Sequence, residues 1–148
     1  SLLNQQLKLK GIRVDIRAPK PPVTIRGSWN QLEQVLVNLI TNARDAVLDN
    51  GPDKDKFILI SAEPDASGRH LDIIVKDTGN GISPEHRDFL FDPFFTTKPV
   101  DKGTGLGLSI SYGIIEEHDG ALELLDSGPE GTTFRIRLPI TEVQDDRQ

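Results

Sequence analysis

Oxygen-bearing side chains recur at three- and four-residue steps near the start of the chain, a spacing that can hold a hydrated cation. They are Gln31, Gln34, Asn38, Asn42, Asp45 and Asp49. Such steps return to one face of a helix, so the set predicts a polar stripe. Mg²⁺ prefers hard oxygen ligands and keeps several waters, which amides one turn apart would suit. The stripe is equally typical of the solvated face of an ordinary helix, and alone it does not distinguish the two.

The helix that must carry these side chains is predicted by an apolar stripe on its other side. Its members are Leu32, Val35, Leu36, Leu39, Ala43, Ala46 and Val47. Their spacing is that of a core-facing helical stripe over residues 31–47. Ser28 and Gln31 have the spacing of a capping box at its start. Asn50, Gly51 and Pro52 predict its end.

A carboxylate closes the apolar face of a predicted strand over residues 71–77. Leu71, Ile73, Val75 and Asp77 alternate onto one face, so the aspartate is predicted to lie inward and to need a partner. The following residues 77–81, Asp-Thr-Gly-Asn-Gly, could simply be a tight connection, because Asn-Gly is a strong turn signal. A turn alone does not explain why an acid ends a buried row.

Glycines cluster before a predicted helix over residues 108–118. Gly103, Gly105 and Gly107 would let backbone N–H groups approach an anion at the positive end of the helix dipole. No Gly-Lys-Ser/Thr follows, which excludes a P-loop, and the spacing excludes the Rossmann fingerprint. Glycine-rich turns also serve packing, so the cluster alone is ambiguous. Residues 96–104 follow a phenylalanine-rich segment and are predicted to form a mobile flap.

The remaining patterns predict a single domain that mixes helices and strands. Strands are expected over residues 12–16, 23–25, 57–62, 121–125 and 132–138, and a short helix is expected from Ser83. In the last strand Thr132 shares the inward face with Phe134, Ile136 and Leu138.

Composition narrows the possible partners. The 148 residues carry a net charge of −6, which argues against non-specific nucleic-acid binding. No apolar run is long enough to cross a bilayer, so we expect no membrane contact, and no signal peptide is visible. There is no cysteine and no methionine. We expect a piece of a longer protein, without disulfides or thiolate metal sites. The cysteine count says little about compartment; the expected location is cytoplasmic, whether or not the parent protein is anchored in a membrane.

Four motifs occur in the order and at the intervals of one known family. They are the Asn38/Asn42 pair, residues 77–81, residues 91–98 (Phe-Asp-Pro-Phe-Phe-Thr-Thr-Lys) and residues 103–108 (Gly-Thr-Gly-Leu-Gly-Leu). Over residues 11–140 the chain resembles the catalytic, ATP-binding domain of two-component sensor histidine kinases, within the gyrase, Hsp90 and MutL group. The resemblance implies an α+β two-layer α/β sandwich of the Bergerat type, with three helices on one face of a mixed, mainly antiparallel β-sheet.

The resemblance also implies a site for ATP and Mg²⁺. Asn42 matches the magnesium-coordinating asparagine, with Asn38 in the same box, and Asp77 matches the acceptor of the adenine amino group. Asn38 and Lys98 are then the catalytic candidates. The other residues implied to contact the nucleotide are Gly79, Gly81, Ile82, Thr97, Gly103, Thr104, Gly105, Leu106, Gly107, Leu108 and Thr132.

Two departures from the family pattern bear on chemistry. The hydrolysing relatives have a glutamate at the position of Asn38, and an amide cannot act as a general base, so we expect slow hydrolysis and phosphoryl transfer to a histidine. Many members have a lysine at the position of Asp45, so phosphate contacts there are in doubt unless Arg44 or Lys98 compensates.

The acceptor histidine is expected outside this chain. None of His70, His86 and His118 is followed by an acidic residue and an Asn-Pro pair, and His118 is expected to stabilise a helix end by about 0.5 kcal/mol if charged. We expect residues 1–10 to be a linker or the end of a dimerisation helix, 11–140 the catalytic domain and 141–148 a flexible tail.

The expected partners follow from that division of the chain. They are the phosphoacceptor and dimerisation domain of the parent kinase and, indirectly, a response regulator, with a monomer in isolation. An ATPase of the chaperone or topoisomerase type and a non-catalytic nucleotide-sensing module remain as alternatives.

Overall fold

The computed structural model describes residues 2–93 and 106–141. In chain order the elements are α1 (Leu2–Leu9), β1 (Arg13–Arg17), α2 (Trp29–Leu48), β2 (Phe57–Pro64), β3 (His70–Asp77), α3 (Pro84–Arg87), α4 (Gly107–Glu117), β4 (Ala121–Gly128) and β5 (Gly131–Pro139). Residues 97, 98 and 103–105, which carry predicted site roles, and the expected tail beyond residue 141 lie outside the described residues.

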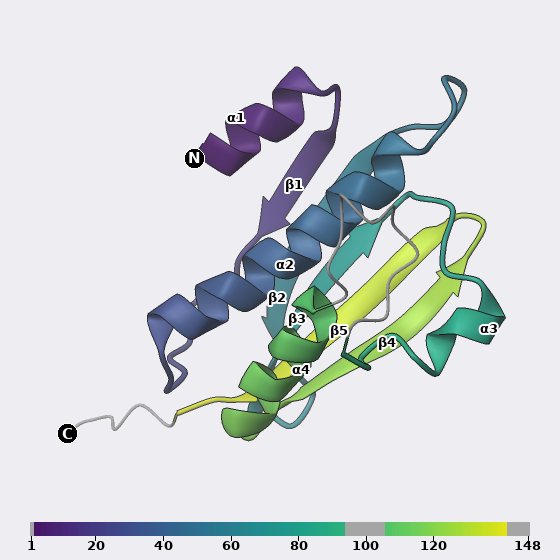
Figure 1. The fold of residues 1–148 in the computed structure, drawn as a ribbon. Coiled ribbons are helices and arrows are strands. Elements are labelled where there is room, and N and C mark those ends of the chain that lie inside the picture. Colours follow the sequence, from purple (N-terminus) through teal and green to yellow (C-terminus); the bar gives the residue numbers. More distant parts are fainter. Residues whose placement is uncertain (1, 94–105, 142–148) are drawn as a thin grey trace.

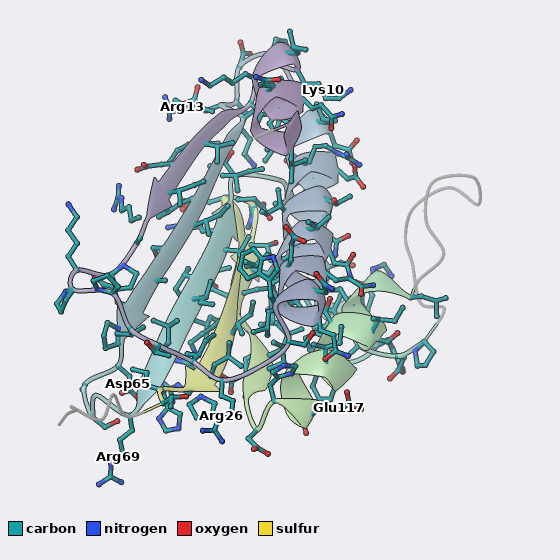
Figure 2. All side chains as sticks on the ribbon, turned by 90° about the vertical axis from the view of Figure 1, so that its left-hand side faces the viewer. Lys10, Arg13, Arg26, Asp65, Arg69 and Glu117 are labelled. Atoms are coloured by element: carbon teal, nitrogen blue, oxygen red, sulfur yellow. The ribbon has the colours of Figure 1, made fainter. Side chains whose placement is uncertain are left out.

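The strands form one mixed sheet in the order β1-β2-β3-β5-β4. Only β1 and β2 run parallel, while the other neighbouring pairs are antiparallel. Helices α1, α2 and α4 lie over the same face of this sheet (Figure 1). Seen after a quarter turn, the sheet and the helices separate into two layers (Figure 2). The α+β sandwich with a mixed, mainly antiparallel sheet is therefore confirmed.

The core lies between α2 and the inward faces of the central strands. On α2 the buried residues are Val35, Leu39, Ala43 and Val47, all members of the predicted apolar stripe. On β5, residues Thr132, Phe134, Ile136 and Leu138 alternate inward as predicted. Burial of the Val, Leu, Ile and Phe side chains among them, roughly 1.5–3 kcal/mol for each one fully buried, fixes the rotation of α2 and so the direction of its polar side chains.

His118 joins the start of α2 to the end of α4. Ser28 caps α2 by accepting a hydrogen bond from the Gln31 N–H, at 3.3 Å. The Ser28 N–H donates to His118 Nε2 at 3.1 Å, while His118 Nδ1 lies 2.8 Å from the Ile114 carbonyl. Since Nε2 accepts, Nδ1 must donate, which describes a neutral ring. The expected stabilisation of the helix end by a charged ring is thus replaced by two neutral hydrogen bonds.

One predicted strand is wrong. Residues 23–25 form no ladder, and Ile25 makes only an isolated bridge with Ile140. Pro21 and Pro22 precede this segment and have no N–H to donate to a neighbouring strand. The other predicted strands are present with ends shifted by a few residues.

Within residues 2–93 and 106–141, no helix has both the length and the apolar character needed to cross a bilayer.

Candidate functional site

The Asp77 carboxylate lies buried at the end of a central strand. It sits on β3 opposite Ile58 of β2 and Thr132 of β5, and the residue is only 6% exposed. Its Oδ1 accepts the Gly79 N–H at 2.8 Å. Burial raises the pKa of this carboxyl above its ordinary value, opposed by backbone hydrogen bonds from Gly79 and Thr132 and by the Lys54 charge. A carboxylate held this way is an acceptor of hydrogen bonds with a fixed direction.

The loop from Thr78 to Ser83, called here the β3–α3 loop, is wedged between α2 and the β4–β5 turn. A Cβ added to Gly79 would lie 2.7 Å from the Ala46 Cβ on α2. Gly81 has φ +84°, and a Cβ there would collide with the Gly128 carbonyl before the turn. Gly79 is required by close packing alone, whereas Gly81 is required by both close packing and backbone conformation. The loop leads from β3 to α3, so its Asn-Gly pair does not close a hairpin between two strands.

Buried hydroxyls support the far side of this loop. The Ser127 and Thr132 hydroxyls lie 2.9 Å apart, and Ser127 Oγ accepts the Ile82 N–H at 2.7 Å. Arg87 of α3 donates to the carbonyls of Ser127 and Ile82. Thr132, predicted to face inward from alternation, pairs with Asp77 in the sheet register. The Ile82 N–H is bound to the Ser127 hydroxyl, which also contacts the Thr132 hydroxyl. Ser127 and Arg87 carried no sequence signal, because neither belongs to a periodic pattern or a motif.

Asn38 holds the start of α4 against α2. Its Nδ2 donates to the Gly107 carbonyl at 3.2 Å and to the buried Ser111 hydroxyl at 3.1 Å. Both contacts use the amide nitrogen, so the amide oxygen is the atom left to face a ligand. Leu106 precedes α4 as its N-cap, and Leu108 packs against the core.

The row Asn38, Asn42 and Ala46 connects the two ends of the site. These residues follow one another at four-residue steps on α2, and eight helical residues rise about 12 Å. Asn38 contacts the start of α4, while Ala46 contacts the β3–α3 loop at Gly79. Asn42 lies between them. The structure thus brings the first, second and fourth sequence motifs together along one helix face.

Arg44 does not point freely toward this row. It pairs with its neighbour Asp45, with Arg44 Nη2 2.9 Å from Asp45 Oδ1. For Arg44 to contact phosphate in place of a lysine, this ion pair would have to open.

Lys54 and Asn50 are site residues that the sequence did not reveal. Lys54 Nζ donates to the Gly79 carbonyl at 2.8 Å and to Asn80 Oδ1 at 3.2 Å. Asn50, 7% exposed, donates to the Thr78 carbonyl at 2.9 Å. In the sequence both lie in a polar stretch after α2 that resembles an ordinary solvated loop.

The donor set for a metal consists of amides rather than a carboxylate or imidazole cluster. Within residues 2–93 and 106–141, no three His, Cys, Asp or Glu side chains gather as a metal site. Amide oxygens on the α2 row fit a hard cation that retains waters and binds phosphate oxygens as well.

The fold and the site together define a class. The fold is an α/β sandwich, with a helical layer over a mixed sheet. Its site combines a buried carboxylate at a strand end, a glycine-containing loop and a helix that begins at a glycine. Together they define a nucleotide-binding domain. Residues 27–142 match the family model described as histidine kinase-, DNA gyrase B- and HSP90-like ATPase. The chain belongs to this family, and its relatives place it among the histidine kinase catalytic domains.

Three known proteins illustrate the similarity. The two-component sensor PprA of Pseudomonas aeruginosa is 39% identical over 139 residues, which cover 94% of this chain but 15% of that protein. The catalytic domain of histidine kinase ThkA has a TM-score of 0.79 at 30% identity, covering 95% of this chain and 88% of that one. Full-length ShkA in complex with AMPPNP has a TM-score of 0.80 at 26% identity, covering 96% and 28%. The chain therefore spans only a small part of the sensor protein that it matches.

The two glycines beside α2 should respond differently to the same substitution. Gly79→Ala forces a methyl group against Ala46, whereas a Cβ at Gly107 would lie 3.9 Å from Asn38 Cγ in ordinary contact. We expect Gly79→Ala to lower the free energy of unfolding by about 1–3 kcal/mol, the usual effect of overpacking, and Gly107→Ala to lower it by less than about 0.5 kcal/mol. Urea unfolding of both variants measures this, and equal losses would contradict the close packing of the loop.

Asp77 should make stability depend on pH in a defined direction. Burial raises the pKa of Asp77 in the folded state, so folding gains from this group at pH values below its ordinary pKa of 3.8 and loses that gain as pH rises through the folded pKa. Asp77→Asn removes the titration. We expect the unfolding free energy of the wild type, relative to this variant, to increase from about pH 7 to about pH 4.

The control for this pH series is Asp53→Asn, which removes an exposed carboxylate of equal charge. Chemical denaturation at each pH gives the comparison. A wild type that loses stability relative to Asp77→Asn as the pH falls would show that the carboxyl is not disfavoured by burial.

Proposed function

We propose that this domain binds Mg²⁺–ATP along the α2 row and donates the γ-phosphoryl group to a histidine on a separate domain. The single observation that carries the proposal is the row itself. It joins a buried, oriented carboxylate at the β3–α3 loop to the N-terminus of α4 over about 12 Å, so one elongated ligand could contact both ends. ShkA, a similar protein, is described in complex with AMPPNP, an ATP analogue, which supports a triphosphate ligand.

At the adenine end, Asp77 accepts the adenine amino group. Its buried position strengthens such a hydrogen bond, because water competes poorly there, and the Gly79 N–H fixes the direction of the carboxylate. Gly79, Gly81 and Ile82 bring the backbone close to the base, and Thr132 closes the pocket beside Asp77.

At the phosphate end, the triphosphate contacts backbone N–H groups at the start of α4, from Leu106, Gly107 and Leu108. Gly103, Thr104 and Gly105, which lie outside the described residues, are also proposed as contacting residues. The helix dipole favours negative charge there. Thr97 and Lys98 contribute from the preceding segment, where the lysine offers a point charge to the terminal phosphates. These cationic and dipolar groups offset the negative net charge of the chain.

Asn42 and Asn38 are the residues that would hold Mg²⁺, through their amide oxygens. The bound ion would neutralise charge that develops on the transferred phosphoryl group. The Asn38 amide nitrogen is already committed to Gly107 and Ser111, which orients its oxygen. An amide at this position cannot act as the general base that activates water. Slow hydrolysis follows, and the phosphoryl group is retained for transfer.

The remaining parts of the parent protein supply the acceptor. We propose that residues 1–10 end a helix of the phosphoacceptor and dimerisation domain, that 11–140 are the catalytic domain and that 141–148 are a flexible tail. The similar kinase ThkA is described in complex with the response regulator protein TrrA, which supports a response regulator as the final recipient. We propose a cytoplasmic location for this domain. The isolated chain is then a monomer.

Nucleotide binding is tested through Asp77. We expect Asp77→Asn to weaken Mg²⁺–ATP binding by about 1–3 kcal/mol, because the amide leaves a buried donor or acceptor unmatched. Calorimetric titration of wild type and variant gives the difference. Exposed Asp53→Asn controls for the loss of one charge, and equal affinity of Asp77→Asn and wild type would remove Asp77 from the adenine site.

Transfer is tested by mixing. This chain, a separately made acceptor-helix domain and ATP labelled at the γ-phosphate should yield acid-labile label on a histidine of the acceptor domain, with little free phosphate released. Asn38→Glu restores a carboxylate at the position of the missing base and should raise phosphate release. Steady hydrolysis by the wild type without transfer would favour the chaperone or topoisomerase type of ATPase, and ATP binding with neither reaction would favour a nucleotide-sensing module.

A further inference from the structure

We propose that Lys54 is a positioning residue for the adenine end of the site. Its ammonium group joins three chain segments that are distant in sequence, namely the loop after α2, the β3–α3 loop and the β4–β5 turn. This inference rests on the proposed nucleotide site and adds to it a residue outside all four sequence motifs.

The ammonium group of half-buried Lys54 has three hydrogen-bond acceptors. Nζ donates to the Gly79 carbonyl at 2.8 Å, to Asn80 Oδ1 at 3.2 Å and to the Pro129 carbonyl at 2.5 Å. An ammonium has three donors, and three acceptors match that number. Hydrogen bonds from a charged donor are roughly twice as strong as neutral ones. One side chain therefore connects both walls of the adenine end.

Asn50 fixes the segment that carries Lys54. Its Nδ2 donates to the carbonyls of Asp55 and Thr78, each at 2.9 Å, and the Thr78 hydroxyl donates to the same Asp55 carbonyl at 2.8 Å. The loop after α2 is thereby bound to Thr78 on one side of Lys54. The lysine approaches Gly79 from a fixed base rather than from a mobile loop.

Two close approaches show why the loop needs such an anchor. Gly81 has a positive φ and lies against the Gly128 carbonyl, and Gly131 lies against the Asp77 carbonyl, so neither glycine has room for a side chain. The Ile82 N–H and the Arg87 guanidinium hold the far end of the loop to Ser127. Lys54 adds a connection at the near end, from Gly79 to Pro129, and it holds Gly79, whose N–H donates to Asp77.

The role predicts a specific loss of affinity. Lys54→Met should weaken binding of Mg²⁺–ATP and of adenosine by the same factor, about tenfold, because the lesion lies at the base and not at the phosphates. Lys54→Arg should recover part of the loss, since it keeps the charge and several donors. Titrations followed by the amide spectrum of the 148-residue chain give all the dissociation constants.

The matched control is Arg137→Met. It also removes one cation and its hydrogen bonds, to Asp72 at 2.7 and 2.9 Å, but on the sheet face away from the helices. We expect it to bind ATP and adenosine within twofold of the wild type even if it lowers stability as much as Lys54→Met does. Should Lys54→Met fail to fold, Lys54→Gln replaces it, because its amide can still reach one acceptor.

Two outcomes overturn the proposal: Lys54 variants that bind like Arg137→Met, or variants that lose affinity for ATP but not for adenosine. A measurement without ligand separates this inference from the nucleotide site. Hydrogen exchange of the Gly79 N–H in the free chain should speed up at least about tenfold in Lys54→Met and stay unchanged in Arg137→Met. Unchanged exchange in both variants refutes the anchor, whether or not the wild type binds ATP.

Discussion

The structure depends on keeping a carboxylate buried at the end of the central strand β3. Burial disfavours the charged form, and this raises the pKa of Asp77 even though two backbone N–H groups and Lys54 oppose the effect. A group in that position lowers the stability of the folded protein compared with an apolar residue. Its surroundings are accordingly organised to limit the loss, with glycines that admit the backbone and a lysine that supplies the opposite charge.

Helix α2 links the surroundings of this carboxylate to the rest of the site. One face packs Val35, Leu39, Ala43 and Val47 on the sheet, which sets the rotation of the helix. The row of Asn38, Asn42 and Ala46 then runs along the edge of that packed face, between the start of α4 and the β3–α3 loop. Because the helix is rigid, the distance between the two ends of the site is fixed by the rise per residue and does not depend on loop conformation.

The fold positions this helix through contacts that join distant segments. His118, as a neutral ring, connects the end of α4 to the cap of α2. Asn38 connects the same two helices at the start of α4. The His118 ring uses both of its nitrogens in this connection, whereas Asn38 uses only its amide nitrogen. The contact with the Gly107 carbonyl needs a hydrogen-bond donor, which an amide supplies and an ionised carboxylate does not.

The sequence by itself determined every feature that depends on local repetition. The apolar periodicity of α2, the inward alternation of β5, the cap at Ser28 and the four ordered motifs are local or short-range patterns, so one chain was enough to predict the mixed fold and to single out Asn38, Asn42, Asp77 and Thr132. Only residues 23–25 failed as a strand, since partner strands and not propensity decide whether a short segment pairs.

Only the tertiary structure decided which polar loop residues meet. Lys54, Asn50 and Arg87 act through backbone carbonyls up to 75 residues away in the chain, and any residue type has such a carbonyl. No spacing rule links a lysine to an acceptor that carries no sequence signature. The neutral state of the His118 ring was likewise decided by the tertiary structure, because the partner of the ring is the Ser28 backbone N–H, 90 residues away.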